Sequence, residues 1–220
     1  MTNVNGKYLP ALGHHRLTPL YYPVQRWLMQ ESRLERRLLK QAGIQPGQRV
    51  LDLGCGTGTL SVLLKQSQPQ AEAVALDADP KVLTIARTKA ARASLGITFD
   101  QGLATHLPYP DRSFDCVLSS LMLHHLAKLQ KERTLREAYR VLRPGGEIHV
   151  MDFGRPHVAY TRLVALLLIQ FEQVADNIKG LLPETMHYAG FEEVNETAKF
   201  VTVVGSISFY QARRANRPPL

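Results

Sequence analysis

The middle of the chain repeats a short apolar run followed by an amphipathic segment. The runs at 49–53 (RVLDL) and 73–77 (AVALD) are almost continuously apolar, which is typical of parallel strands covered on both faces. Shorter runs predict further strands at 97–99, 115–119 and 147–151. Because helical patterns lie between most of these runs, we expect βαβ units and a parallel sheet.

Helical periodicity accounts for most of the intervals. Residues 27–42 place leucines along one side and arginines elsewhere, as an amphipathic helix does. Further helices are predicted at 57–65, 80–94 and 132–142. The helix at 80–94 begins with Asp79 as its N-cap and a proline at its first position. An Arg-Pro-Gly-Gly sequence ends the helix at 132–142.

The last third of the chain has a different pattern. Residues 157–178 predict one long apolar helix, and residues 181–188 predict another. Two β-rich runs within 194–210 predict strands that close the sheet as a hairpin or an extended edge pair. Since no linker marks a second domain, we expect a single α/β domain over 1–220. Its expected parts are an N-terminal arm and cap helix (1–45), a ligand-binding core (46–153), cap and substrate helices (154–190), and closing strands with a tail (191–220).

Composition and charge limit the class of protein. The chain has 220 residues, 45% of them hydrophobic, and a net charge of +8, so an anionic partner is favoured without being identified. The longest apolar stretch, 163–169, is far shorter than the roughly 20 residues that span a bilayer. With no signal-peptide pattern at the N-terminus, a cytoplasmic location is expected. Cys55 and Cys116 are expected to be buried free thiols that lie too far apart to form a disulfide.

The most informative segment is a glycine-rich turn between the first strand and the next helix. Gly54, Gly56 and Gly58 follow Asp52 in the spacing G-x-G-x-G, whereas the dinucleotide-binding fingerprint is G-x-G-x-x-G. A carboxylate at Asp52 would repel a diphosphate and attract a ligand that carries an ammonium and a sulfonium. The charge therefore favours S-adenosylmethionine (SAM) over NAD as the ligand of this turn.

A second acid supports an adenosine ligand. Asp77 ends the second strand, 19 residues after Gly58 (77 − 58). An acid at this place can accept hydrogen bonds from both ribose hydroxyls. Because NAD uses the same contact, Asp77 alone does not distinguish SAM from NAD.

Four blocks in a fixed order carry a resemblance to a known family. They are VLDLGCGTG, VALDADPKVLTIA, LPYPDRSFDCVLSSLMLHHL and REAYRVLRPGGEIHVMDF. Over about residues 48–153 the chain resembles the class I SAM-dependent methyltransferases. It is most similar to the group that includes the quinone-biosynthesis C-methyltransferases and many small-molecule methyltransferases. The resemblance implies a doubly wound, Rossmann-like sheet of seven mostly parallel strands with an antiparallel last strand, together with a helical cap.

The resemblance also implies roles for individual residues. The residues implied to bind SAM are Asp52, Gly54, Cys55, Gly56, Gly58, Asp77, Ala78, Gly102, Leu103, Ala104, Ser119 and Leu121. Leu103 stands where relatives usually carry an acid that binds the adenine amino group, so backbone groups of 102–104 or packing of Leu103 on the ring would replace that contact. Tyr21 or Tyr22 would close over the carboxylate of SAM, and we assign Tyr22 to SAM and Tyr21 to the acceptor.

Methyl transfer from a sulfonium depends mainly on positioning and desolvation, and a base helps where the acceptor must lose a proton. His124 and His125 follow the fourth strand at the ligand-binding edge. We name His124 as the candidate base and assign His125 a packing role. An apolar acceptor pocket is expected around Tyr21, His124 and Phe153 with residues of 163–171. No metal site is expected, because the histidine pair at 14–15 has no third ligand at a suitable spacing.

Alternative functions remain open from the sequence. A nucleic-acid (RNA) methyltransferase would fit the net charge, but Ser119-Ser120-Leu121-Met122 replaces the N/D-P-P-Y/F-like block of base methylators, so nucleic acid is disfavoured as a partner. A SAM-binding module without transfer activity is a further alternative, and Asp52 argues against an oxidoreductase. The apolar helix near 163–171 could line a pocket or contact an anionic membrane surface. The preferred partner is a small, hydrophobic acceptor molecule, and no pattern indicates an oligomeric state.

Overall fold

The computed structural model describes residues 31–168, 170 and 172–216. Tyr21 and Tyr22, the arm before residue 27 and the start of the helix expected at 27–42 lie outside the described residues. The elements, in chain order, are α2 (Glu31–Ala42), β1 (Arg49–Leu53), α3 (Thr59–Ser67), β2 (Glu72–Asp77), α4 (Pro80–Arg92), β3 (Thr98–Gln101), β4 (Phe114–Ser120), the 3₁₀ helix η1 (Leu123–His125), α5 (Lys128–Val141), β5 (Leu142–Phe153), α6 (Ala159–Leu168), α7 (Glu172–Lys179), α8 (Leu182–Tyr188), β6 (Glu192–Thr202) and β7 (Gly205–Arg213).

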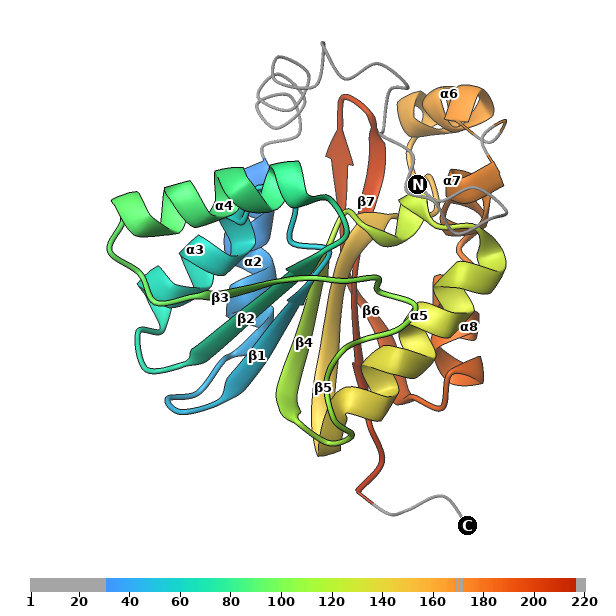
Figure 1. The fold of residues 1–220 in the computed structure, drawn as a ribbon. Coiled ribbons are helices and arrows are strands. Elements are labelled where there is room, and N and C mark those ends of the chain that lie inside the picture. Colours follow the sequence, from blue (N-terminus) through green and yellow to red (C-terminus); the bar gives the residue numbers. More distant parts are fainter. Residues whose placement is uncertain (1–30, 169, 171, 217–220) are drawn as a thin grey trace.

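A seven-stranded sheet in the order β3-β2-β1-β4-β5-β7-β6 forms the centre of the molecule (Figure 1). In the part of the sheet with the order β3-β2-β1-β4-β5, all adjacent strands are parallel to one another. β7 is antiparallel to both β5 and β6. The predicted doubly wound, mostly parallel sheet with an antiparallel last strand is confirmed.

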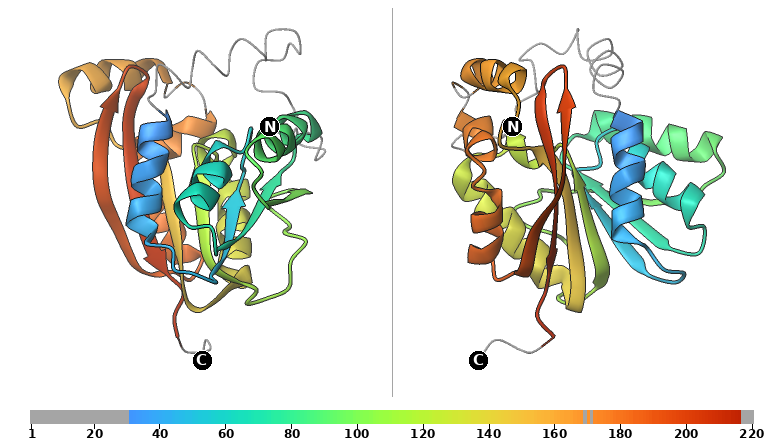
Figure 2. Two further views of the ribbon diagram at one scale, coloured as in Figure 1. Left: turned by 90° about the vertical axis from the view of Figure 1, so that its left-hand side faces the viewer. Right: turned by 180° about the vertical axis from the view of Figure 1, so that it is seen from behind.

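Helices cover both faces of the sheet and form two hydrophobic cores. On one face, Leu38 of α2 and Leu64 of α3 pack with Val50 of β1, and α4 lies beside α3 on this side (Figure 2). On the other face, Leu135 of α5 and Met186 of α8 pack with the alternate strand residues, whose side chains point to that face. This arrangement explains the continuous apolar runs, because successive strand side chains enter different cores.

The order of the strands creates a switch point between β1 and β4. The chain moves outward from β1 through β2 to β3 and then returns to add β4 on the other side of β1. The connections leaving β1 and β4 therefore diverge, which opens a crevice at the carboxyl ends of these two strands. The glycine turn after β1 and η1 after β4 both lie at that crevice.

Two predicted elements differ from the structure. The single long helix expected at 157–178 is wrong, because α6 and α7 are separate helices joined around Gln170. The strand expected at 147–151 begins earlier: β5 includes Arg143-Pro144-Gly145-Gly146, since Leu142 already pairs with Phe114 of β4. The expected hairpin near the C-terminus is confirmed as β6 and β7. Cys55 and Cys116 are both buried free thiols, as predicted.

α6 and α7 form a cap above the carboxyl end of β5, beside the tip of the β6–β7 hairpin (Figures 1 and 2). α7 contacts η1 and β5, and α6 contacts β7. The buried Lys131 of α5 fastens this cap, since its Nζ donates a hydrogen bond of 2.6 Å to the Gln173 carbonyl and lies 3.9 Å from Asp176. Within the part of the chain that the structure describes, no helix is long and apolar enough to span a membrane.

Arg214 connects the C-terminal end of β7 to the end of α5. Its Nη1 donates hydrogen bonds of 2.6–2.8 Å to the carbonyl oxygens of Tyr139, Arg140 and Leu142. The guanidinium also lies 4.7 Å from the centre of the Tyr139 ring. Since the last carbonyls of a helix lack partners within it and carry partial negative charge, this buried cation stabilises the junction of α5 and β5.

We expect Arg214→Ala to lower the free energy of unfolding by about 3 kcal/mol, because it removes a buried charged donor from three carbonyl oxygens at this junction. Urea unfolding followed by circular dichroism measures this loss. Arg213→Ala is the matched control: Arg213 is half-exposed and pairs with Glu147 at the surface, so its loss should change stability much less. Equal losses in the two variants would contradict this role for Arg214.

Candidate active site

The glycine turn after β1 brings backbone close to the crevice. Gly54 (φ 77°) and Gly56 (φ 52°) have left-handed conformations that favour glycine. A Cβ on Gly54 would lie 2.2 Å from the Met122 side chain, so this glycine is required by close packing. A Cβ on Gly56 would meet no described atom within 4 Å. The turn is therefore tightly packed behind Gly54 and open in front of Gly56.

Asp52 is a buried carboxylate directly before this turn. Its side chain is 2% exposed and accepts a short hydrogen bond from the Ser61 hydroxyl of α3. Burial raises the pKa of Asp52 to about 7; the Ser61 hydrogen bond opposes this rise, and the nearby Asp77 adds to it. Asp52 is thus a carboxylate whose ionised form would be favoured by a cation in the crevice.

Asp77, at the end of β2, faces the same turn. It accepts hydrogen bonds from the backbone N–H of Gly56 (2.8 Å) and of Asp79 (2.9 Å). Burial raises the pKa of Asp77, although these N–H donors oppose the shift. The predicted pair of acids, Asp52 and Asp77, is therefore brought to one site by adjacent parallel strands.

The remaining residues implied to bind SAM surround these acids. Gly102 donates its N–H to the carbonyl of Asp77 (3.0 Å), which holds the segment after β3 beside the end of β2. The Leu103 side chain is 41% exposed and is available to pack on a planar ring. Ser119 is buried at the end of β4, and its Oγ has no hydrogen-bond partner among the described residues. Leu121 has a left-handed φ of 53°, a strained conformation typical of functional sites.

A histidine–aspartate pair lies at the ends of β4 and β5. Nδ1 of His124 lies 2.8 Å from Oδ1 of Asp152, and the His124 backbone N–H donates to Oδ2 at 3.2 Å. Burial of Asp152 would raise its pKa, but the positive charge near His124 and the N–H of Phe153 outweigh it, so the pKa is lowered. Since the ionised Asp152 only accepts hydrogen bonds, Nδ1 of His124 carries a proton and Nε2 is the basic nitrogen of the neutral imidazole.

His125 differs from its neighbour. The two imidazole rings have their centres 4.0 Å apart. The charge of His124 and then burial lower the pKa of His125 to about 3, so His125 stays neutral at ordinary pH. This supports the packing role expected for His125. No three His, Cys, Asp or Glu side chains of the described residues are grouped as a metal site would require.

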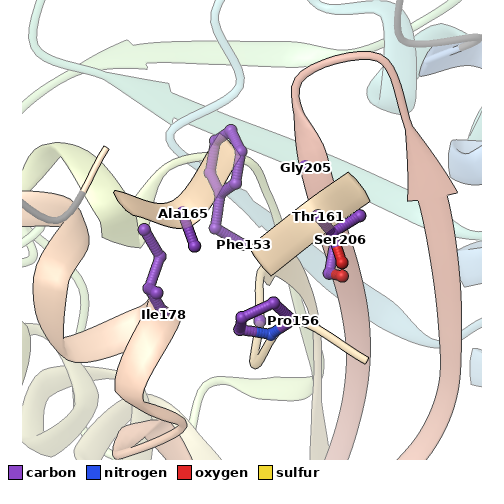
Figure 3. A pocket seen from close by; sticks show the side chains of 8 residues that line it. Phe153, Pro156, Thr161, Ala165, Ile178, Gly205 and Ser206 are labelled. Atoms are coloured by element: carbon purple, nitrogen blue, oxygen red, sulfur yellow. The ribbon is translucent and has the colours of Figure 1, made fainter. Parts of the chain in front are cut away.

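An adjacent pocket lies under the cap. It is partly open to solvent, and its cavity volume is about 10 Å³, enough for about one water molecule, so a ring could enter only if α6 and α7 moved apart. Phe153, Ala165 and Ile178 supply apolar walls, while Thr161 and Ser206 supply hydroxyl groups (Figure 3). The Phe153 ring packs edge-on against His124, with 4.8 Å between the ring centres. Phe153 therefore contacts both the His124 ring and the pocket.

Comparisons with known proteins agree with this geometry. A methyltransferase-domain family matches residues 50–146. An uncharacterized methyltransferase of Synechocystis sp. is 36% identical over 83% of this chain and 84% of its own length. A demethylmenaquinone methyltransferase of Thermus thermophilus is 37% identical over 69% of this chain and 67% of its own. The chain belongs to the class I SAM-dependent methyltransferases. It is a methyltransferase that uses SAM and acts on a small molecule.

The fold is shared with solved structures of this family. A SAM-dependent methyltransferase of Aquifex aeolicus superposes with a TM-score of 0.61 at 19% identity, over 91% of this chain and 97% of that protein. Because the identity is low, this similarity concerns the fold alone.

The residues of the methyltransferase fit SAM chemically. A cationic sulfonium and ammonium suit the buried carboxylate of Asp52, and the open space before Gly56 admits a ligand against bare backbone. Asp77 has carboxylate oxygens for ribose hydroxyls. The unpartnered Oγ of Ser119 offers a further polar contact at the same edge.

Sequence reasoning missed Asp152 and Ser61. Asp152 lies one residue from the carboxyl end of β5, as Asp52 does in β1. The argument used for Asp52 would therefore have identified it. Ser61 had no such signal, because its role depends on how α3 packs against β1.

We expect Asp52→Asn to weaken SAM binding at least about tenfold, because a neutral amide loses the charge-assisted attraction. In the unmodified protein, SAM affinity should rise with pH through about 7 as Asp52 ionises, and this component should be absent in the variant. Isothermal titration one pH unit below and above that pKa measures both effects. Equal affinity in the two proteins would contradict a role for Asp52 in SAM binding.

The same substitution should stabilise the ligand-free protein above pH 7. The folded pKa of Asp52 lies above its ordinary value of 3.8, so its favourable contribution to folding is complete below 3.8 and is lost as the pH rises through 7. Asn avoids that loss, which amounts to at most about 4 kcal/mol. Urea unfolding without SAM is the measurement.

Proposed function

We propose that this methyltransferase methylates a hydrophobic, quinone-type ring in its reduced form, with His124 as the base. The observation that carries the proposal is the His124–Asp152 pair beside an apolar pocket. A relative named as a demethylmenaquinone methyltransferase supports the acceptor class. We also propose that the protein acts in the cytoplasm.

SAM, when bound, supplies an electrophilic methyl group on a positively charged sulfur. Asp52 would balance that charge, and Asp77 would orient the ribose. The residues proposed to contact SAM are Asp52, Gly54, Cys55, Gly56, Gly58, Asp77, Ala78, Gly102, Leu103, Ala104, Ser119, Leu121 and Tyr22.

His124 would activate the acceptor. Its Nε2 would accept the proton of a ring hydroxyl, so that electron density moves to the neighbouring ring carbon and that carbon becomes the nucleophile. Asp152 would hold the imidazole through Nδ1 and stabilise the imidazolium that forms, as a buried carboxylate does in other histidine pairs. SAM would supply the methyl group to that carbon and leave as the neutral thioether. The imidazolium of His124 would return its proton to the ring oxygen, and the freed imidazole would accept the proton of the methylated carbon, which restores the aromatic ring.

Phe153 and the cap would position the acceptor. Phe153 touches His124 on one side and the pocket on the other, so an aromatic ring stacked or edge-on against it would lie close to the base. Ala165 and Ile178 would exclude water around the ring, which favours transfer to carbon over competing hydrolysis. Tyr21 stays a proposed contact of the acceptor.

The test is methyl transfer from labelled SAM to a demethylated naphthoquinol kept reduced under nitrogen, with product identified by mass spectrometry. We expect a ring-methylated product, and no transfer when the same ring is supplied fully oxidised, because the quinone has no hydroxyl proton to remove. Transfer to RNA but not to any quinol would overturn the proposal.

We expect His124→Gln to lower kcat about 100-fold or more while leaving SAM affinity within about twofold, because it removes the base without touching the glycine turn. Asp152→Asn should lower kcat roughly tenfold or more. The reason is that a neutral amide cannot stabilise the imidazolium that would form on His124.

His125→Gln is the matched control for these two variants. His125 lies next to His124 and is only partly buried, and it makes no contact with Asp152 through its ring in the proposed mechanism, so the substitution should leave kcat within about threefold of the unmodified value. An Asp152→Asn protein whose kcat equals that of the His125→Gln control would contradict a role for Asp152 in the reaction.

A further inference from the structure

Helix α6 exposes an apolar face, which is the reverse of an ordinary surface helix. Tyr160, Leu163 and Leu166 lie at three-residue intervals and are 49%, 63% and 66% exposed, so they form one stripe along the helix. The opposite side of α6 supplies Thr161 and Ala165 to the pocket. A helix on the surface of a globular protein normally turns polar side chains to solvent, so this face requires an explanation.

The tip of the β6–β7 hairpin extends the same surface. Val201 and Val203 are 50% and 51% exposed, and the Tyr160 hydroxyl donates a 2.5 Å hydrogen bond to the carbonyl of Val203. α6 and the hairpin tip lie side by side in both views (Figures 1 and 2). We call this surface the cap face; its members are Val158, Tyr160, Leu163, Leu166, Val201 and Val203.

The charge around the cap face is positive. Arg162 lies within α6, and Arg155 lies in the loop before α6, with its side chain beside Gly180 at the end of α7; both are exposed. Neither forms an ion pair with another residue in the part of the chain that the structure describes. The sequence has no Asp or Glu from 153 to 171, and none after Glu196. Apolar side chains with arginines and no acids are typical of a surface that meets anionic lipid headgroups.

The pocket lies directly beneath this surface. α6 supplies Thr161 and Ala165 to its lining, and the hairpin supplies Gly205 and Ser206. The two elements that carry the cap face are therefore the two that flank the pocket (Figure 3). A hydrophobic acceptor in a bilayer could reach the pocket from a cap face seated on that bilayer, without crossing water.

We propose that the cap face docks on an anionic phospholipid surface from which the acceptor is taken. The inference rests on the proposed function for its account of the acceptor, but the docking can be measured without any acceptor. Charge disfavours a second copy of this chain as the occupant: a symmetric dimer through the cap face would bring Arg155 and Arg162 of both copies together without acids to balance them.

Sedimentation with lipid vesicles tests the docking. The full chain is mixed with vesicles of phosphatidylcholine alone or of phosphatidylcholine with phosphatidylglycerol, at low and at high salt. We expect binding to the vesicles that contain phosphatidylglycerol, and weaker binding at high salt. Arg155→Gln with Arg162→Gln should weaken it about 25-fold, from roughly fivefold for each arginine. Leu163→Glu with Leu166→Glu should weaken it at least about tenfold.

A matched control lies on α4, at the far side of the sheet. Ile85→Glu with Arg92→Gln changes an exposed apolar residue and an exposed cation there, and vesicle binding should stay within about twofold. SAM titration of every variant checks folding and keeps the two proposals separate: lost vesicle binding with intact SAM binding concerns the cap face alone.

Three results would overturn the docking. The first is an unmodified protein that binds SAM but sediments with neither kind of vesicle, which would mean that the cap face is covered or inert. The second is vesicle binding by the cap-face variants that equals that of the α4 variant. The third is a dimer in sedimentation equilibrium that Leu163→Glu with Leu166→Glu converts to monomer, which would make a second copy the occupant.

Discussion

The burial of the Asp52 carboxylate is the constraint on which the rest of the site depends. A carboxyl group that is 2% exposed loses most of its hydration, and the Ser61 hydroxyl recovers only part of that loss, so its pKa rises to about 7. The ligand-free fold therefore holds an acid that is incompletely stabilised as an anion. A cationic ligand removes this deficit, whereas a diphosphate would increase it. The desolvation that destabilises ionised Asp52 in the ligand-free protein would therefore favour a sulfonium donor over an anionic ligand.

The strand ends and the cap supply different parts of the site. β1, β2 and β5 each carry an aspartate at the carboxyl edge, and the parallel register of the sheet fixes these three side chains relative to one another. Rigid elements hold reacting groups more accurately than loops do. The pocket under the cap instead combines Phe153 of β5 with residues of α6, α7 and β7. Such a division allows one donor site to serve different acceptors.

The core of the fold could be predicted from the sequence because each signal there was local. The apolar run of β1, the N-cap Asp79, which accepts the N–H of Lys81, and the spacing of the glycines all depend on adjacent residues. The break between α6 and α7 had no such signal, since the apolar pattern continues across Gln170. The early start of β5 was missed because a Pro-Gly-Gly sequence ordinarily ends an element, whereas here Gly145 and Gly146 pair with Arg214. Pairing between distant segments overrode the local preference.

The pairing of His124 with Asp152 shows why a site residue is found from sequence only in part. The position of His124 after β4 follows from the order of the elements, so the histidine could be nominated. Its basic nitrogen could not, because the choice between Nδ1 and Nε2 depends on which ring atom a partner 28 residues away engages. Asp152 also makes the environment of His124 different from that of His125, although the centres of the two imidazole rings lie only 4.0 Å apart. Two adjacent histidines of identical composition thus acquire different chemistry, and the difference originates in the alignment of β5 beside β4.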